Sequence, residues 1–369
     1  MKIKKLCLPI LLLFIPTGCL HSTVIDDIRL VQAIGYDYVG DDLVLSTVAV
    51  PNYTMGGGES GGGPSSSATT DSFSVISHTG KAIPTKMQTK AQQPLKLGKV
   101  NTILFDEDLA KHGIDDFVDY LNRDPVIGRK LYLAVVDGST QELLSGQYEE
   151  SQAVSIYLND LIKQNIKYNL PRMNLHEFLY SYFGQGKDPI LPILKKSGDH
   201  IEITGIALFR NGKYVGKIPI PNKTFIFKLM SQPFEGGAYE FYLKNNPSAY
   251  ISVLNTGSKV TYSVKNGNSA SPDILIHVKM KAIITEAPLR SNPKEYINKI
   301  SKAMEKDIEK QGEQLVEKFQ KMSVDPLGLG AKTRSQTRGW DFEKWKDHYP
   351  NADVKLKVDI QVKQTGITE

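Results

Sequence analysis

Cysteine is scarce in this chain of 369 residues. The chain has only two cysteines, Cys7 and Cys19, and both lie within the first nineteen residues. The remaining part, about 350 residues, therefore has no thiol and cannot form a disulfide. Exported proteins depend on disulfides mainly when they are small, whereas a chain of this length buries enough apolar surface without them.

Long hydrophobic runs are absent after the first fifteen residues. Residues 6–15 form one apolar run, and Lys2, Lys4 and Lys5 precede it. This run is about half as long as the ~20 apolar residues that a membrane-spanning helix needs. A positively charged start followed by a short apolar run predicts an export signal rather than a transmembrane helix.

The apolar run leads into residues 15–19, IPTGC, which resemble a bacterial lipobox although Pro16 stands where such motifs usually carry leucine. In a lipobox, a diacylglyceryl group alkylates the cysteine thiol, and a peptidase then cuts before that cysteine. We therefore predict that the signal peptide, residues 1–18, is removed after Gly18 and that Cys19 becomes a lipidated N-terminus. Two acyl chains would anchor the protein stably, since each buried methylene contributes about 0.8 kcal/mol. The alternative is a simple secretory signal with an incidental cysteine.

Concentrated charge of one sign is also absent. The chain has 45 lysines and arginines against 40 acidic residues, a net charge of +5. Loss of the three lysines of the signal peptide leaves 5 − 3 = +2 for the mature chain. Proteins that bind nucleic acid usually carry a concentrated basic face, so this balance argues against a nucleic-acid partner.

Catalytic motifs are present only as near misses. His176 and Glu177 begin like the helix of a zinc protease, but Tyr180 occupies the place of the second histidine. Residues 291–294 have a serine–lysine spacing that helix capping explains, and residues 328–333 lack the spacing of a phosphate-binding loop. The histidines show no ligand-like spacing, and no nucleophile elbow occurs. We therefore predict no catalytic, metal or cofactor-binding residues and a protein that is not an enzyme.

The pattern of apolar residues predicts an α+β fold of three domains. In the first, residues 19–185, two apolar runs surround a Gly-Asp-Asp turn at residues 40–42 and indicate two strands. Residues 55–70 are rich in glycine and serine and predict a disordered surface loop. From residue 99 onward, buried strands alternate with helices, predicted at residues 100–105, 115–122, 131–136 and 152–167.

The second and third domains are predicted at residues 186–246 and 247–369. The second contains only strands, at residues 203–209, 213–218 and 224–229, and Asn211-Gly212 is a strong hairpin signal. In the third, Asn292 and Pro293 suit the start of a long helix. One face of that helix is apolar and carries Ile297, Ile300, Met304, Ile308, Leu315, Phe319 and Met322. The alternating strand at residues 354–362 completes a sheet whose one face the helix would cover.

Four segments, in this order, resemble the Ger(x)C family, the lipoprotein C subunits of spore germinant receptors. The first reads IGYD, and the second combines LGKVNTILF with LAKHGI. The third reads GIALFRNGKYVG, and the fourth reads DPLGLG before two tryptophans. These segments occupy residues 34–37, 97–114, 205–216 and 325–330, and the tryptophans are Trp340 and Trp345.

The resemblance implies a membrane lipoprotein on the outer face of the inner spore membrane, where Cys19 would anchor it. There it would join the integral A and B subunits and act in nutrient-triggered germination through protein–protein contacts. Only the lipidated cysteine carries over as a site residue, while the segment around Gly205 and the two tryptophans, Trp340 and Trp345, are expected to be structural. Binding of a small-molecule germinant by this subunit stays open. The alternative is a solute-binding lipoprotein that delivers a small molecule to a transporter.

Overall fold

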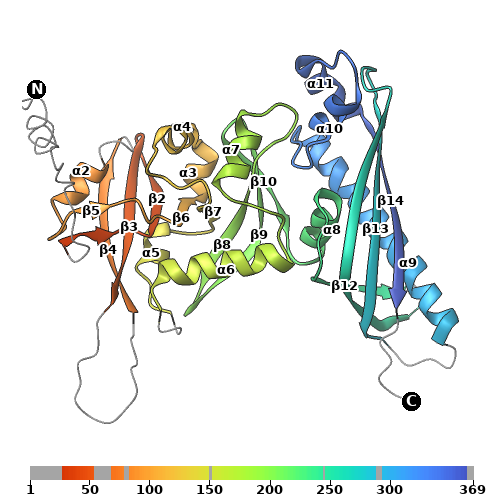
Figure 1. The fold of residues 1–369 in the computed structure, drawn as a ribbon, viewed down its shortest axis with the longest axis horizontal. Coiled ribbons are helices and arrows are strands. Elements are labelled where there is room, and N and C mark those ends of the chain that lie inside the picture. The colour runs from red at the N-terminus through yellow and green to blue at the C-terminus, as the bar shows by residue number, and fades with distance from the viewer. Residues whose placement is uncertain are drawn as a thin grey trace, which may run out of the picture.

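The computed structural model describes residues 27–53, 68–78, 83–148, 152–243, 246–287 and 293–363. Within these residues the chain forms an eight-stranded sheet, a four-stranded sheet and a small two-stranded one, all accompanied by helices (Figure 1). The fold is α+β, as predicted. The predicted signal peptide, Cys19 and residues 55–67 of the predicted glycine-rich loop lie outside the described residues. The last three residues of that predicted loop, 68–70, are instead the start of strand β4 (Ala68–Ser77).

The eight-stranded sheet has the order β10-β9-β8-β7-β6-β2-β3-β4. Its middle strands β2, β6, β7 and β8 run parallel to one another, and the remaining neighbours pair antiparallel. The strands are β2 (Ala33–Gly40), β3 (Leu43–Tyr53), β4 (Ala68–Ser77), β6 (Thr102–Asp106), β7 (Tyr132–Val136), β8 (Ile190–Ser197), β9 (His200–Arg210) and β10 (Lys213–Pro219). A separate pair joins β1 (Arg29–Leu30) to β5 (Leu95–Lys96).

Helices cover both faces of this sheet, so its central strands are buried on both sides. One face packs against α5 (Thr140–Leu144) and α6 (Val154–Tyr168). The other packs against α3 (Glu107–His112), α4 (Asp115–Arg123) and α7 (Leu175–Phe183). Strand β6 is therefore apolar throughout its middle, with Leu104 facing the first group and Phe105 the second. The short helix α2 (Ile83–Gln88) lies beside β4.

The predicted hairpin at Asn211-Gly212 is confirmed. Both residues have positive φ, 48° and 70°, as a two-residue hairpin turn between β9 and β10 requires. This hairpin and β8 extend the eight-stranded sheet, although they lie in the predicted middle domain of residues 186–246. The rest of that stretch packs with the second sheet, and the division into three domains stays a prediction.

The strand predicted at residues 224–229 is wrong, because this segment belongs to helix α8 (Asn222–Ser231). Phe225, Ile226, Phe227 and Leu229 are all buried. A short apolar run that is buried on all sides carries no periodicity that separates a strand from a helix. Helix α8 is wedged between β10 on one side and α9 and β12 on the other (Figure 1).

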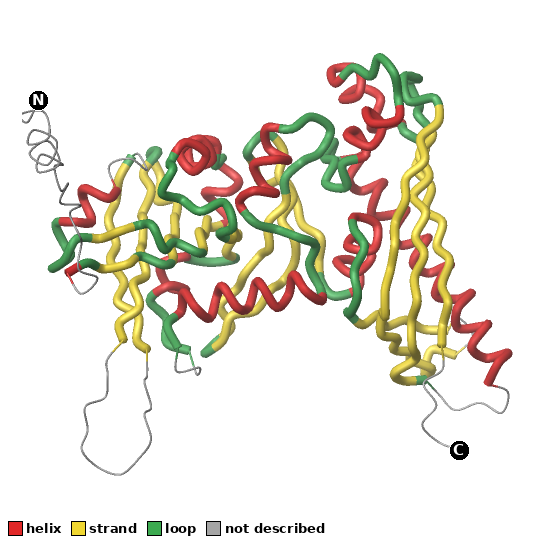
Figure 2. The backbone as a smooth tube through the Cα atoms, in the orientation of Figure 1, coloured by secondary structure: helices red, strands yellow, loops and turns green. Residues whose placement is uncertain are grey.

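The second sheet has the order β11-β12-β13-β14 and carries one long helix, as predicted. Its strands are β11 (Ala238–Leu243), β12 (Asn246–Lys265), β13 (Asp273–Glu286) and β14 (Asp353–Lys363), and the helix is α9 (Pro293–Lys321). Figure 2 shows this region as long strands beside one long helix, unlike the alternating helices and strands of the first sheet. Most of the predicted apolar face of α9 is buried, namely Ile300, Met304, Ile308, Leu315 and Phe319.

A row of carboxylates on α9 covers the outer edge of β14. Glu305, Glu309 and Glu313 each accept a hydrogen bond from a backbone N–H of β14, at 3.0 to 3.2 Å. These N–H groups belong to alternate residues of the strand, and the glutamates are spaced one helical turn apart. An unpaired strand edge invites association with another strand, so this row protects the sheet.

Candidate functional site

The junction between the two sheets joins segments that are far apart in the sequence. Residues 184–189 connect α7 to β8, and residues 322–328 connect α9 to α10 (Leu329–Gln336). Helix α11 (Phe342–His348) and the short helix η4 (Tyr349–Asn351) lie beside them. These segments meet near the upper ends of α7 and α9 in Figure 1. We call the hydrogen-bonded centre formed by Gly186, Asp188, Asp325, Gly330 and Tyr349 the junction core.

Asp325 is the hub of the junction core. Its buried carboxylate accepts hydrogen bonds from the backbone N–H groups of Leu329 at 2.9 Å and Gly330 at 2.7 Å, at the start of α10. Its own N–H donates to a carboxylate oxygen of Asp188 at 2.6 Å, and the N–H of Asp188 donates back to the Asp325 carbonyl at 2.9 Å. These reciprocal bonds tie the first sheet to the second.

Burial sets the electrostatics of this pair. Burial is the main cause that raises the pKa of Asp325 to about 7; the backbone N–H donors oppose this rise and the nearby charge of Asp188 adds to it. Burial likewise raises the pKa of Asp188, and the charge of Arg210 opposes that rise. Both carboxyl groups accept hydrogen bonds from backbone N–H groups, which indicates that they stabilise the contact between the two sheets.

Close backbone packing completes the junction core. Gly186 has a φ of 80°, and a Cβ atom there would lie 2.5 Å from the backbone nitrogen of Ala331. The Ala331 N–H donates to the Gly186 carbonyl at 2.8 Å. On the other side, the Tyr349 hydroxyl donates to the carbonyl of Val324 at 2.9 Å. The Tyr349 ring packs on Trp345, with 5.5 Å between the ring centroids.

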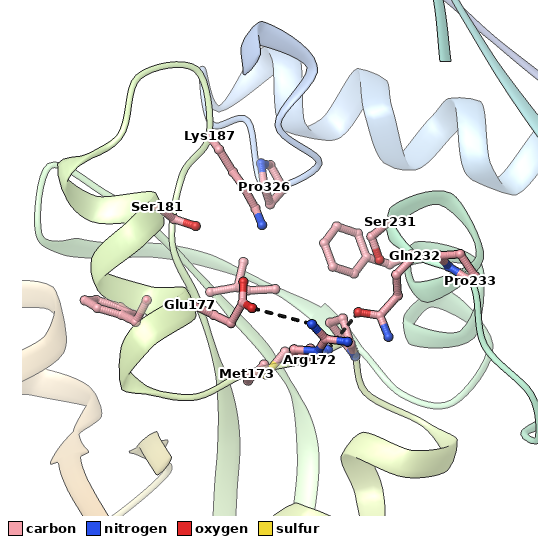
Figure 3. A pocket seen from close by; sticks show the side chains of 13 residues that line it. Arg172, Met173, Glu177, Ser181, Lys187, Ser231, Gln232, Pro233 and Pro326 are labelled. Carbon is pink, nitrogen blue, oxygen red and sulfur yellow. Dashed lines mark hydrogen bonds and ion pairs between the residues drawn. The ribbon is translucent and has the colours of Figure 1, made fainter. Parts of the chain in front are cut away.

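Two hollows flank this core. The upper cleft, about 700 Å³, is lined by Phe183, Arg210, Trp345 and Lys346 among others. The junction pocket, about 490 Å³, lies between α7, α8 and Pro326 (Figure 3). It is lined by Pro171, Arg172, Met173, Glu177, Phe178, Ser181, Lys187, Ile190, Phe227, Ser231, Gln232, Pro233 and Pro326. Lys187 also contributes to the upper cleft, so both hollows share the segment that joins α7 to β8.

The residues singled out from the sequence have mainly structural surroundings. His176 is exposed on α7. No group of three side chains suited to a metal ion occurs among the residues that the structure describes. Trp345 is buried and Trp340 packs against the same core, in agreement with the predicted packing role. A Cβ atom at Gly205 would lie 2.5 Å from the carbonyl oxygen of Ile218, so a glycine is needed there. The structure does not test lipidation of Cys19.

Two polar arrangements escaped the sequence analysis. The junction core was one, because its acidic residues lie 137 positions apart and match no motif. The other involves Asp37 in the first resemblance segment. Its carboxylate accepts hydrogen bonds from the backbone N–H of Thr140 at 2.6 Å, the Thr140 hydroxyl at 2.7 Å and the N–H of Gln141 at 3.0 Å. Asp37 therefore fixes the first turn of α5 to the end of β2, which explains a polar residue at that position.

Comparisons with known proteins agree with this architecture. A family profile described as "Spore germination protein N-terminal domain" matches residues 21–196, and one described as "Spore germination B3/ GerAC like, C-terminal" matches residues 204–366. The chain is 33% identical over 356 residues to Spore germination protein GerQC of Bacillus cereus, covering 95% of this chain and 96% of that protein. The chain belongs to the GerAC-like family of spore germination proteins. The family resemblance of its four sequence segments is thus confirmed.

Further relatives cover the chain from end to end. The putative spore germination protein YfkR of Bacillus subtilis is 24% identical, covering 99% of this chain and 97% of that protein. A solved structure described as the GerBC protein matches with a TM-score of 0.59 at 18% identity, covering 89% of this chain and 96% of that one, and so supports the fold. Among the described residues, no helix of this family member has the length and apolar character to cross a bilayer.

Proposed function

We propose that this family member is the lipid-anchored subunit of a spore germinant receptor. Cys19 would hold it at the outer face of the inner spore membrane. There it would bind the integral A and B subunits and act without catalysis. The observation that carries this proposal is the match to spore germination proteins over nearly the whole chain, together with the lipobox-like residues 15–19 at its start.

The junction supports a role in contacts between proteins. The carboxylates of Asp188 and Asp325 accept hydrogen bonds from backbone N–H groups, so they hold two sheets together rather than stand free for proton transfer. The upper cleft beside them combines exposed and partly buried aromatic rings, Phe183 and Phe342, with the charged side chains of Arg210 and Lys346. Aromatic residues and arginine are the side chains most enriched in protein interfaces.

Replacement of the two cysteines tests the anchoring role. We expect Cys19→Ala to leave the domains folded, to release the chain from spore membranes and to impair nutrient germination. Cys7→Ala is the matched control, because Cys7 would leave with the signal peptide and its loss should change neither property. Membrane fractionation and the fall in optical density of nutrient-treated spores measure the two outcomes. Normal germination with wholly soluble Cys19→Ala protein would contradict the anchoring role.

A further inference from the structure

Lys187 is a half-buried lysine whose ammonium group makes no close contact with an acceptor among the described residues. Its side chain reaches into the junction pocket near Ser181 and Pro326 (Figure 3). Its carbon stem lies against Gly328, where a Cβ atom would come within 3.2 Å of it. Within the part of the chain that the structure describes, its ammonium group has no hydrogen bond or ion pair. Burial lowers the pKa of Lys187, as removal of a cation from water should, and the charges of Glu177 and Asp325 oppose that fall without contacting the ammonium group directly.

A second lysine, Lys228, shows how a buried ammonium group with a structural role is hydrogen-bonded in this chain. Lys228 on α8 donates to the carbonyl oxygens of Ile166 at 2.9 Å and Lys167 at 3.0 Å, at the end of α6. Lys187 has no such acceptors among the described residues, and an anion placed beside a partly desolvated cation stabilises it.

The charged side chains that line the pocket carry one more positive than negative charge. The side chains of Arg172 and Glu177 lie 3.9 Å apart and offset each other's charge. The backbone N–H of Arg172 donates to the side-chain oxygen of Gln232 at 2.9 Å. The Ser231 hydroxyl donates to the carbonyl of Lys228. The charged residues that line the pocket are Arg172, Glu177 and Lys187, with a net charge of +1. A ligand with a single negative charge would neutralise it.

The remaining walls are apolar. Phe178, Ile190 and Phe227 line the pocket together with Met173 and several prolines. The volume of about 490 Å³ lies in the range of pockets that hold small organic ligands. We propose that the junction pocket binds a small organic carboxylate, with its anionic group against Lys187 and Ser181 and its apolar body against Phe178, Ile190 and Phe227. Such a ligand has the one charge and the apolar surface that these walls complement.

Because elements packed on both sheets line the pocket, a bound ligand would affect the stability of their arrangement. Phe178 lies on α7, which packs on the first sheet, and Ile190 lies on β8 of that sheet. Phe227 lies on α8, and Pro326 lies in the loop after α9. A bound carboxylate would touch elements packed on both sheets and would stabilise their present arrangement against unfolding. This inference concerns a site within the chain and does not depend on the membrane anchor or on the partner subunits.

Titration of the purified full-length mature lipoprotein in mild detergent tests the proposal. The probes are two carboxylates, isocaproate and benzoate, with the matched amines isoamylamine and benzylamine. We expect saturable calorimetric binding of at least one carboxylate, a ligand-dependent rise in Tm, and no binding of either amine. Lys187→Gln should weaken carboxylate binding about tenfold or more, since it removes a charged hydrogen-bond donor. Lys346→Gln, at a lysine of the upper cleft, should bind as the unmodified protein does.

Three results would overturn the proposal. They are carboxylate binding that is unchanged in Lys187→Gln, binding of the amines in place of the carboxylates, and the absence of saturable binding of both carboxylates at millimolar concentration. Far-ultraviolet circular dichroism of Lys187→Gln establishes that the variant is folded. If it is not, Ser181→Ala serves as the second variant, and unchanged binding in that variant would equally contradict the proposed pose.

Discussion

The junction core and the junction pocket share one segment of chain, residues 184–189, but differ in whether their charged side chains have hydrogen-bond partners. In the core, Asp325 is buried and Asp188 is partly buried, and both carboxylates accept hydrogen bonds from backbone N–H groups at 2.6 to 2.9 Å. In the pocket, Lys187 is half-buried and meets no acceptor among the described residues. The first arrangement stabilises the fold, whereas the second leaves a charge available to a ligand. Adjacent residues thus have separate roles.

The largest effect on stability is expected from removal of the Asp325 carboxylate, which connects the segments of the junction core. We expect Asp325→Ala to lower the free energy of unfolding by about 3 kcal/mol or more, because two buried N–H groups of α10 lose their acceptor. Asp347→Ala, at an exposed aspartate on α11, is the control and should stay within about 0.5 kcal/mol of the unmodified chain. Urea unfolding measures both. Equal stability of the two variants would show that the core contributes nothing to the joint.

The dependence of stability on pH also tests the role of Asp325 in the junction core. Burial raises the pKa of Asp325 from 3.8 to about 7, so the folded state binds more protons than the unfolded state between these values. The contribution of Asp325 to the free energy of unfolding therefore falls as pH rises from about 4 to 7 and is level above that range. Asp325→Asn cannot titrate, and we expect the stability difference between the two proteins to shrink by about 1 kcal/mol or more across this interval. A difference that is constant with pH would contradict the raised pKa.

The smallest effect is expected at the pocket. Lys187→Met should change the free energy of unfolding by less than about 1 kcal/mol, or raise it, because the ammonium group gives up no protein hydrogen bond. Lys228→Met, at the lysine that donates to two carbonyl groups, should cost about 1–2 kcal/mol. Thermal and urea unfolding of both variants without ligand would show the difference. A larger loss at Lys187 than at Lys228 would mean that Lys187 serves the fold.

The sequence predicted those elements whose signals are local. The Asn211-Gly212 turn, the apolar face of α9 and the alternating strand β14 each depend on neighbouring residues, and all three are found. Helix α8 was predicted as a strand because its apolar run is buried on all sides, so tertiary packing decides its form.

The junction core could not be predicted, since Asp188 and Asp325 are ordinary aspartates until the fold brings them together. Lys187 carried no signal either, because the lack of a partner is a property of its surroundings rather than of its sequence. Lipidation of Cys19, in contrast, is a prediction from the sequence alone, as this residue lies outside the described part of the chain.

Co-purification from spore membranes tests most directly whether this chain is a receptor subunit. The tagged chain is extracted from inner membranes in mild detergent and captured, and integral A and B subunits of germinant receptors are quantified in the captured material by mass spectrometry. We predict that both subunits are recovered with the tagged chain and are absent from an untagged control. Recovery of the two integral subunits with each other, but never with this chain, would contradict the proposed function.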